Sequence, residues 1–127
     1  MDIPKVLAID YGTVRVGIAV SAGTLADPLE ILANDAHLFE NIVKLCNEHE
    51  VTLLLVGISE NVMAEKTKEF VVELEKHIQL PVTFMDETLS SHSVHEKLVS
   101  AKKSKREGNI DHFAAAEFLQ IWLDENY

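Results

Sequence analysis

Three acidic residues stand where the chain is expected to pass from one structural element to the next. Asp10 ends the apolar run 6–9, and Glu87 follows the apolar run 82–85. Asp111 opens the last stretch with helical spacing. Carboxylates that converge repel one another unless a cation neutralises them, and oxygen ligands without cysteine favour Mg²⁺ or Mn²⁺ over zinc. Two such ions about 3.5–4 Å apart would stabilise the attacking and leaving oxygens of a phosphodiester displacement.

Each of these acids also has a simpler structural role. Asp10 could be a turn residue before Gly12, and Glu87 a solvated strand end. Asp111 could interact only with the positive end of a helix dipole. The metal hypothesis therefore rests on their joint placement, because sites in open α/β sheets form beyond the carboxyl ends of the strands.

The elements that must position these acids can be read from the hydrophobic pattern. A continuous apolar run at 6–9 predicts a strand buried on both faces, and Arg15 to Val20 alternates as its hairpin partner. A short third strand is expected at Pro28 to Leu32, with Pro28 at its start or on an edge. Two further apolar strands are expected at 53–57 and 82–85.

Helical spacing appears in three places, and a further short helix is expected after Glu87, where Ser93 and Glu96 are spaced as a capping box. One helix is expected over Leu38 to Cys46, behind the cap candidates Asn34 and Asp35. A second carries an apolar stripe from Phe70 to Ile78 and stops before a proline, and a third begins at about Asp111. Three strands followed by alternating helices and strands predict an α/β fold, with a mixed sheet and helices on both faces.

Composition limits the remaining possibilities. The 127 residues are expected to form a single domain, 1–127, with a formal net charge of −10. No apolar run approaches the ~20 residues that cross a bilayer, and no leader of the secretory type is evident, so we expect no membrane partner. The single cysteine, Cys46, fits a reducing cytoplasm and an inert core position.

Positive charge is concentrated in one segment of this acidic chain. Five of the eleven basic residues fall within ten positions, namely Lys97, Lys102, Lys103, Lys105 and Arg106. A solvated loop and a local site for anions explain this cluster about equally well.

Three motifs together resemble the YqgF-type family, whose members are described as Holliday-junction resolvases and as pre-16S ribosomal RNA nucleases. The segment from Asp10 to Val20 is similar to the opening D-x-G-x-x-R-x-G-x-A signature of that family. Asp86-Glu87-Thr88-Leu89-Ser90-Ser91 looks like its D-E-x-x-[ST]-[ST] block, and Ile110 to Ala115 like its closing [IV]-D-x-x-A-A helix. The motifs occur in the family's order across nearly the whole chain.

The resemblance implies an RNase H-like fold with a mixed five-stranded sheet, and Mg²⁺-dependent nuclease chemistry with Mn²⁺ as a substitute. It makes Asp10, Glu87 and Asp111 the catalytic metal ligands. Gly12 could take a positive φ and bring backbone amides close to a phosphate, and Arg15 could contact a phosphate through two hydrogen bonds. Lys102, Lys103, Lys105 and Arg106 could bind the nucleic-acid backbone beside the cut.

The substrate that the resemblance favours is the 5′ end of precursor 16S ribosomal RNA, and the alternative is a Holliday junction in DNA. We expect a cytoplasmic monomer or weak homodimer. The sequence departs from the family in the loop 58–63 and at Thr88, where family members carry a glycine-containing loop and an arginine.

Three other classes of function remain open at this point. The opening motif also looks like the phosphate loop of actin-like kinases, although 127 residues hold one lobe at most. A non-catalytic interaction module is compatible with the altered loop. A zinc site formed by His92, His95 and His112 is a further alternative.

Overall fold

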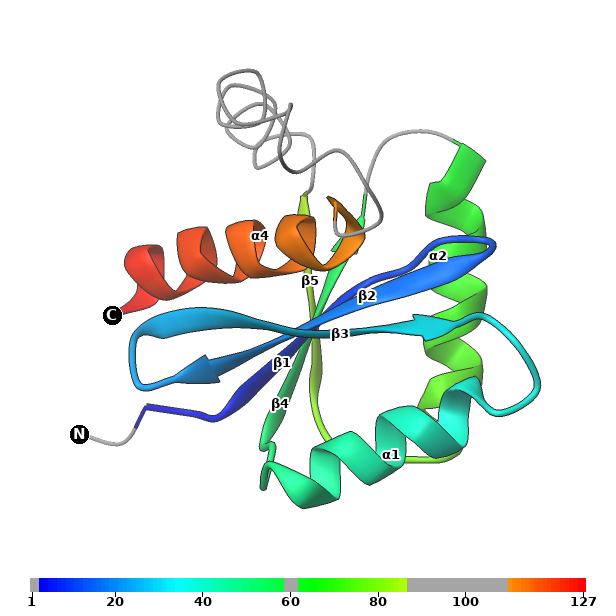
Figure 1. Ribbon diagram of the computed structural model, residues 1–127, viewed down its shortest axis with the longest axis horizontal. Helices are drawn as coiled ribbons and strands as arrows, with labels where there is room; N and C mark the ends of the chain where they lie inside the picture. The colour runs from blue at the N-terminus through cyan, green and yellow to red at the C-terminus, as the bar shows by residue number, and fades with distance from the viewer. Residues whose placement is uncertain (1–2, 59–61, 87–109) are drawn as a thin grey trace.

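Five strands form one mixed sheet at the centre of the molecule (Figure 1). The computed structural model describes residues 3–58, 62–86 and 110–127, and of residues 62–63, 86 and 110–113 it describes the backbone. The strands are β1 (Val6–Asp10), β2 (Arg15–Ala22), β3 (Leu25–Ala33), β4 (Leu53–Ile58) and β5 (Val82–Asp86), in the order β3-β2-β1-β4-β5. β2 is antiparallel to both β1 and β3, whereas β1, β4 and β5 are parallel. The predicted mixed sheet with an antiparallel opening is confirmed.

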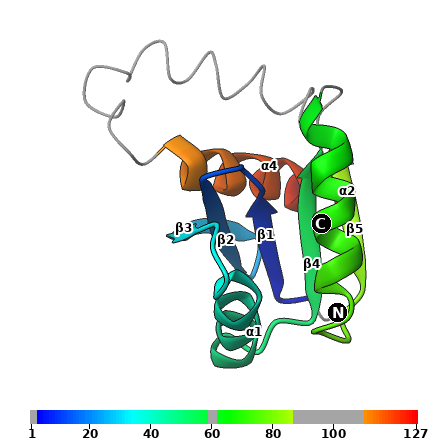
Figure 2. The ribbon, with the colours of Figure 1, turned by 90° about the vertical axis from the view of Figure 1, so that its right-hand side faces the viewer.

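Helices cover both faces of this sheet, as predicted. α1 (Leu38–Glu48) and α2 (Val62–Leu74) pack on one face, and α4 (Ile110–Asn126) packs on the other (Figures 1 and 2). The central strand β1 shows why both faces need a helical layer. Its side chains alternate, so that Leu7 and Ile9 join the core under α1 and α2, while Val6 and Ala8 join the core under α4.

The larger core lies under α1 and α2, and the smaller one under α4. In the larger core, Val16, Ile18 and Val20 face the helices from β2, as their spacing predicts. The smaller core takes fully buried side chains from α4; these are Ala115, Phe118, Leu119 and Leu123. Because β1, β2 and β4 contribute buried side chains to both cores, the centre of the sheet is packed from both sides.

The third strand differs from its predicted bounds. β3 begins at Leu25, three residues before Pro28, and Pro28 lies within it. The strand tolerates this proline because it is the edge of the sheet, and the β2–β3 register shifts between Ile18 and Ala19, opposite this part of β3. A proline lacks the N–H that a central strand would need, so an edge with an irregular register is where it fits.

The predicted caps of α1 also need correction. The residue before α1 is His37, which makes no side-chain capping bond. Asp35 accepts a hydrogen bond from the backbone N–H of His37 at 2.9 Å, so it shapes the approach to the helix. Asn34 instead donates through its side-chain amide to the carbonyl oxygen of Gly12, at 2.7 Å. The helix α2 ends at Leu74, before the predicted Ile78, although Ile78 still packs on the larger core.

Within the described part of the chain, no helix combines the length and the apolar character that crossing a membrane requires.

Candidate active site

Asp10 is the last residue of β1, at the carboxyl edge of the sheet, and it is half-buried. Side chains alternate along a strand, and Val6 and Ala8 belong to the core under α4. The same alternation places the Asp10 carboxylate on the α4 face. The sequence predicted an acid at the end of this buried strand, and the structure adds the face to which it belongs.

Two buried glycines stand beside Asp10 on that face. Gly17 is the pairing partner of Asp10 on β2. Gly57 follows Val56, which pairs with Ile9 on β1, and it shares its face of β4 with Leu55. Neither glycine has a side chain, so the space next to the carboxylate is not filled from either neighbouring strand. Neither of these two strands therefore places a side chain where a cation or a phosphate group would approach the carboxylate.

The helix α4 approaches this space with its first turn. Further along the helix, the side chain of Gln120 accepts a hydrogen bond from Ala26 N–H at 2.9 Å and donates one to the Thr24 carbonyl at 2.8 Å. These contacts hold Gln120 at the turn between β2 and β3, which is the opposite edge of the sheet from Asp10. Figure 1 shows α4 lying along β2 and β3 from that turn.

Lengths along the two elements agree with this orientation. Asp111 is nine residues before Gln120, or about 14 Å of α-helix. Gly17 is five residues before Ala22, the last residue of β2, or about 17 Å of strand. The first turn of α4, which contains Asp111, is therefore directed toward the edge where Asp10 lies.

The other predicted metal ligands and basic residues are only partly within the described chain. Asp111 is the second residue of α4, and its backbone is described. Glu87, His92 and His95 lie outside the described residues, as do the basic residues Lys97, Lys102, Lys103, Lys105 and Arg106. Among the side chains that the structure does describe, no three His, Cys, Asp or Glu residues are grouped so as to hold a metal ion. Asp10 is the one predicted ligand whose side chain belongs to that set.

Gly12 is required for a different reason from the one predicted. Its φ is not positive; among the described glycines, Gly23 has that conformation, with φ 63°. A Cβ atom on Gly12 would clash with the carbonyl oxygen of Arg15. The glycine therefore lets the loop between β1 and β2 close tightly upon itself. Asn34 reinforces this closure, because its backbone N–H also donates to the Val14 carbonyl at 3.0 Å.

Arg15 is exposed and begins β2, two residues before Gly17 and on the same face. Its position is diagonal to Asp10 across the β1–β2 ladder, for which Cβ atoms are about 7–8 Å apart. An arginine side chain can span that distance. The predicted role of Arg15 beside a phosphate is thus compatible with its place in the sheet.

A pocket of about 440 Å³, the hairpin pocket, lies on the other side of the β1 end and was not predicted. It is lined by Tyr11, Thr13, Asn34, Lys66, Glu69 and Phe70. The ring of Tyr11 stacks on that of Phe70 with centroids 4.4 Å apart. The lining residues come from three segments that are far apart in sequence, around Tyr11, Asn34 and Phe70, so no local motif could have predicted this pocket. The sequence placed Phe70 on the apolar stripe of the second predicted helix, and this was the one indication that its ring faces the core near this pocket.

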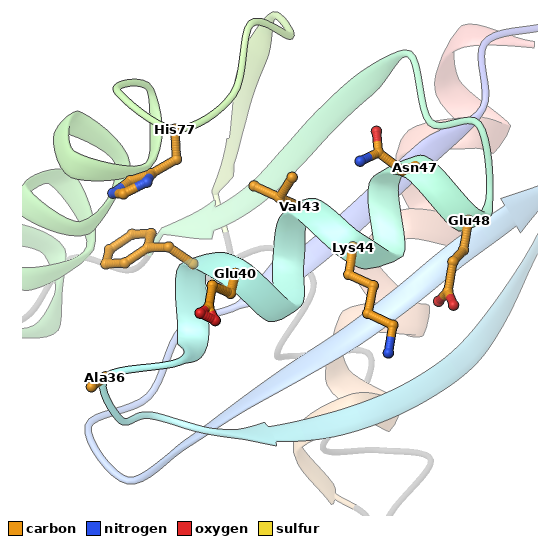
Figure 3. Close-up of a pocket in the computed structure, with 8 residues that line it drawn as sticks. Ala36, Glu40, Val43, Lys44, Asn47, Glu48 and His77 are labelled. Carbon is orange, nitrogen blue, oxygen red and sulfur yellow. The ribbon is translucent and has the colours of Figure 1, made fainter.

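A second pocket, of about 600 Å³, runs along α1 (Figure 3). It is lined by Ala36, Phe39, Glu40, Val43, Lys44, Asn47, Glu48 and His77. The ring of Phe39 stacks on His77 with centroids 4.9 Å apart, which joins α1 to the end of α2. None of the predicted site residues lines this pocket.

Cys46 is buried in the larger core, as its apolar stripe predicts. Burial raises the pKa of its thiol from 9.0 to about 11, since a thiolate there would lose its hydration. The side chain is therefore a neutral thiol at physiological pH and takes no part in the site.

Solved structures with this arrangement of elements define the class of the fold. Thermus thermophilus RuvC in complex with a Holliday junction substrate superimposes with a TM-score of 0.66, at 12% identity, over 98% of this chain and 96% of that one. A second T. thermophilus RuvC structure gives a TM-score of 0.58 at 12% identity, over 95% and 94% of the two chains. The fold is RNase H-like, the class to which RuvC belongs.

Sequence comparison then identifies the family. A family model described as "RuvX: Holliday junction resolvase" matches residues 4–125, and this chain belongs to that family, also called YqgF. Relatives named "Putative pre-16S rRNA nuclease" include one from Sulfurihydrogenibium sp. strain YO3AOP1, which is 34% identical over 94% of this chain and 90% of its own length. A relative of the same name from Halalkalibacterium halodurans is also 34% identical, over 94% and 96% of the two chains. The family resemblance seen in the motifs is confirmed.

Proposed function

We propose that this chain is a Mg²⁺- or Mn²⁺-dependent endonuclease that cuts phosphodiester bonds in structured nucleic acid. The observation that carries the proposal is the position of Asp10. Its half-buried carboxylate lies at the carboxyl edge of the central strand, between two glycines, on the face that the first turn of α4 approaches. Family membership supports nuclease activity, since the relatives are named as nucleases.

The residues at this edge fit a hard divalent cation. Asp10 offers carboxylate oxygens that neither neighbouring strand covers with a side chain, and Asp111 and Glu87 are the further oxygen donors that the motifs supply. Bound there, one or two such ions would supply the positive charge that stabilises the attacking and leaving oxygens of the phosphodiester. We assign Asp10, Glu87 and Asp111 as the catalytic residues that hold them. Cys46 is buried in the larger core and offers no sulfur ligand at this edge, so the donors proposed for the cation are oxygen atoms.

The remaining site residues would position the substrate. Arg15 lies on the face of Asp10 and can donate two hydrogen bonds to a phosphate. Gly12 keeps the hairpin loop tight, so that Arg15 starts β2 at a fixed distance from Asp10. We assign Lys102, Lys103, Lys105 and Arg106 to the nucleic-acid backbone, because these four residues and Lys97 make up five of the eleven basic residues of this acidic chain.

The proposed substrate is the 5′ end of precursor 16S ribosomal RNA, in the cytoplasm, with residues 1–127 acting as one nuclease domain. The names of the relatives support RNA. The alternative substrate is a Holliday junction, which the family description and the RuvC complex support. Paired cuts at a junction need a two-fold dimer, whereas trimming RNA does not. For the RNA substrate we propose a monomer or a weak homodimer.

A cleavage panel tests the proposal. Purified protein is incubated with a precursor ribosomal RNA fragment or a four-way DNA junction, with Mg²⁺, with Mn²⁺ or with a chelator. We expect Mg²⁺-dependent cleavage of the RNA that D10N and E87Q both abolish. Cleavage of the junction alone would favour the resolvase alternative. If folded wild-type protein cuts neither substrate, the nuclease proposal is wrong and a non-catalytic interaction module replaces it.

A further inference from the structure

The hairpin pocket brings one cation, Lys66, together with one carboxylate, Glu69, and several neutral hydrogen-bonding groups. Lys66 contributes an ammonium group from α2, and Thr13 a hydroxyl group from the loop between β1 and β2. Asn34 uses one side-chain N–H for the Gly12 carbonyl, and its second side-chain N–H is the donor that could reach a phosphate oxygen. The stacked rings of Tyr11 and Phe70 fix the wall between loop and helix, so the pocket is formed before any ligand binds.

Its position relates it directly to Asp10. Tyr11 follows Asp10 in the chain, and consecutive Cα atoms are about 3.8 Å apart. Tyr11 packs toward the core under α1 and α2, whereas Asp10 is on the α4 face. The hairpin pocket and the proposed metal site therefore flank the end of the same strand from opposite sides.

Lys66 is well suited to bind an anion there. It is exposed, and among the residues that the structure describes it makes no ion pair. Arg15 stands on the α4 face of the same sheet edge, so these two cations lie on the two sides of the Asp10 strand end.

We infer that the hairpin pocket binds a backbone phosphate of the nucleic-acid strand, close to the phosphate that is cut, and that Lys66 is its charged ligand. This inference rests on the proposed nuclease function and adds a positioning site to it. Arg15 and Lys66 would hold one strand on either side of Asp10. Glu69 on the same wall repels a phosphate and offsets part of the attraction of Lys66.

The test separates binding from cleavage by using the D10N background. The affinity of a labelled precursor ribosomal RNA fragment is measured by fluorescence anisotropy at several salt concentrations. We expect K66A to raise Kd about tenfold, as loss of a charge-assisted contact does, and to reduce the salt slope by about 0.7–0.9. K66R should retain most of the affinity, and E69Q should tighten binding.

K68A is the matched control. Lys68 is exposed on the same helix and carries the same charge, but it is two residues away and does not line the pocket. Its Kd should stay within about twofold of the D10N parent. Thermal unfolding of each variant confirms that binding is compared between folded proteins.

Each outcome has a definite meaning. Equal losses of RNA affinity in K66A and K68A, or no loss of affinity in K66A, would overturn the inference. The nuclease proposal would still stand if the wild-type protein cleaves. A parallel arm uses ATP alone; tight ATP binding that depends on Lys66 would reassign the pocket to a free nucleotide. If wild-type protein neither binds nor cleaves nucleic acid, the proposed function fails and the inference fails with it.

Discussion

Asp10 pairs with Gly17 across the β1–β2 ladder, so the proposed catalytic carboxylate faces a residue without a side chain. In such a pair, a Cβ atom on the opposite strand would lie about 4.5–5.5 Å from that of Asp10. Glycine weakens a strand, and a buried glycine in β2 therefore calls for an explanation beyond the sheet itself. Keeping the space beside the carboxylate open provides one.

A graded substitution series at Gly17 tests this explanation. We expect G17A to lower Mg²⁺-dependent cleavage moderately and G17V to lower it by at least about tenfold, because the larger side chain fills the cation's space. Overpacking should also cost about 1–3 kcal/mol of stability. Cleavage rates are compared well below the melting temperature of each variant. Equal activity of all three proteins would show that the space is not used.

Asp10 itself should be essential for cleavage and of minor importance for folding. Loss of groups that merely support a metal ligand costs 10–100-fold, so replacing a ligand in D10N should cost at least about 100-fold. The half-buried position at a strand end accepts the similar shape of asparagine. D27N, at an exposed carboxylate of β3, is the control and should retain activity. Retained cleavage in D10N would contradict the assignment.

Gly12 and Gly23 should respond differently to substitution. G12A forces a Cβ atom against the Arg15 carbonyl, and the hairpin must shift at a cost of about 1–3 kcal/mol. Gly23 has open space around it and a left-handed backbone, which asparagine tolerates. G23N should therefore unfold close to the wild-type midpoint. The measurement is chemical denaturation of both variants, and equal losses would argue against a tight hairpin loop.

Gln120 should affect activity from a distance. Q120A removes the acceptor for Ala26 N–H and the donor for the Thr24 carbonyl, at a cost of about 1–3 kcal/mol. Because these bonds hold α4 along β2, we also expect slower cleavage. E125A, at an exposed residue of the same helix, should change neither property. Circular dichroism melts and cleavage assays on both variants provide the check.

Burial of Cys46 predicts that the folding stability of the protein depends on pH above neutrality. Its pKa is about 11 in the folded protein and 9.0 without burial, so the unfolded chain releases the thiol proton first as pH rises. The contribution of Cys46 to stability is fully present below about pH 9 and is lost between about pH 9 and 11. C46A should flatten this part of the stability curve. An alkylating reagent at pH 8 should label the native thiol far more slowly than the unfolded one.

Much of the fold could be predicted from the sequence because its signals are local. The apolar run of β1 and the alternation of Val16, Ile18 and Val20 depend only on neighbouring residues, and both were confirmed. Asn34 was misread as a helix cap because its side chain bonds to Gly12, a residue 22 positions earlier in the chain. Local propensity carries no information about such a partner.

The candidate site could be predicted only in part, for the same physical reason. The motif identified Asp10 and the need for glycine at position 12, but it suggested a positive φ where the structure shows a close approach to Arg15. The glycines beside Asp10 and the hairpin pocket depend on strand register and on the packing of α2. The register between two strands is a property of their pairing, so it cannot be read from the sequence of either strand alone.

The packing of α4 on β1, β2 and β3 has a consequence for synthesis of the protein. The first three strands leave the ribosome early, whereas α4 is the last described element of the chain. Until α4 has been synthesised, the face of the sheet on which it packs stays uncovered. Asp111 is then not yet present beside Asp10. The polypeptide would thus acquire the proposed cutting ability only after α4 has been synthesised.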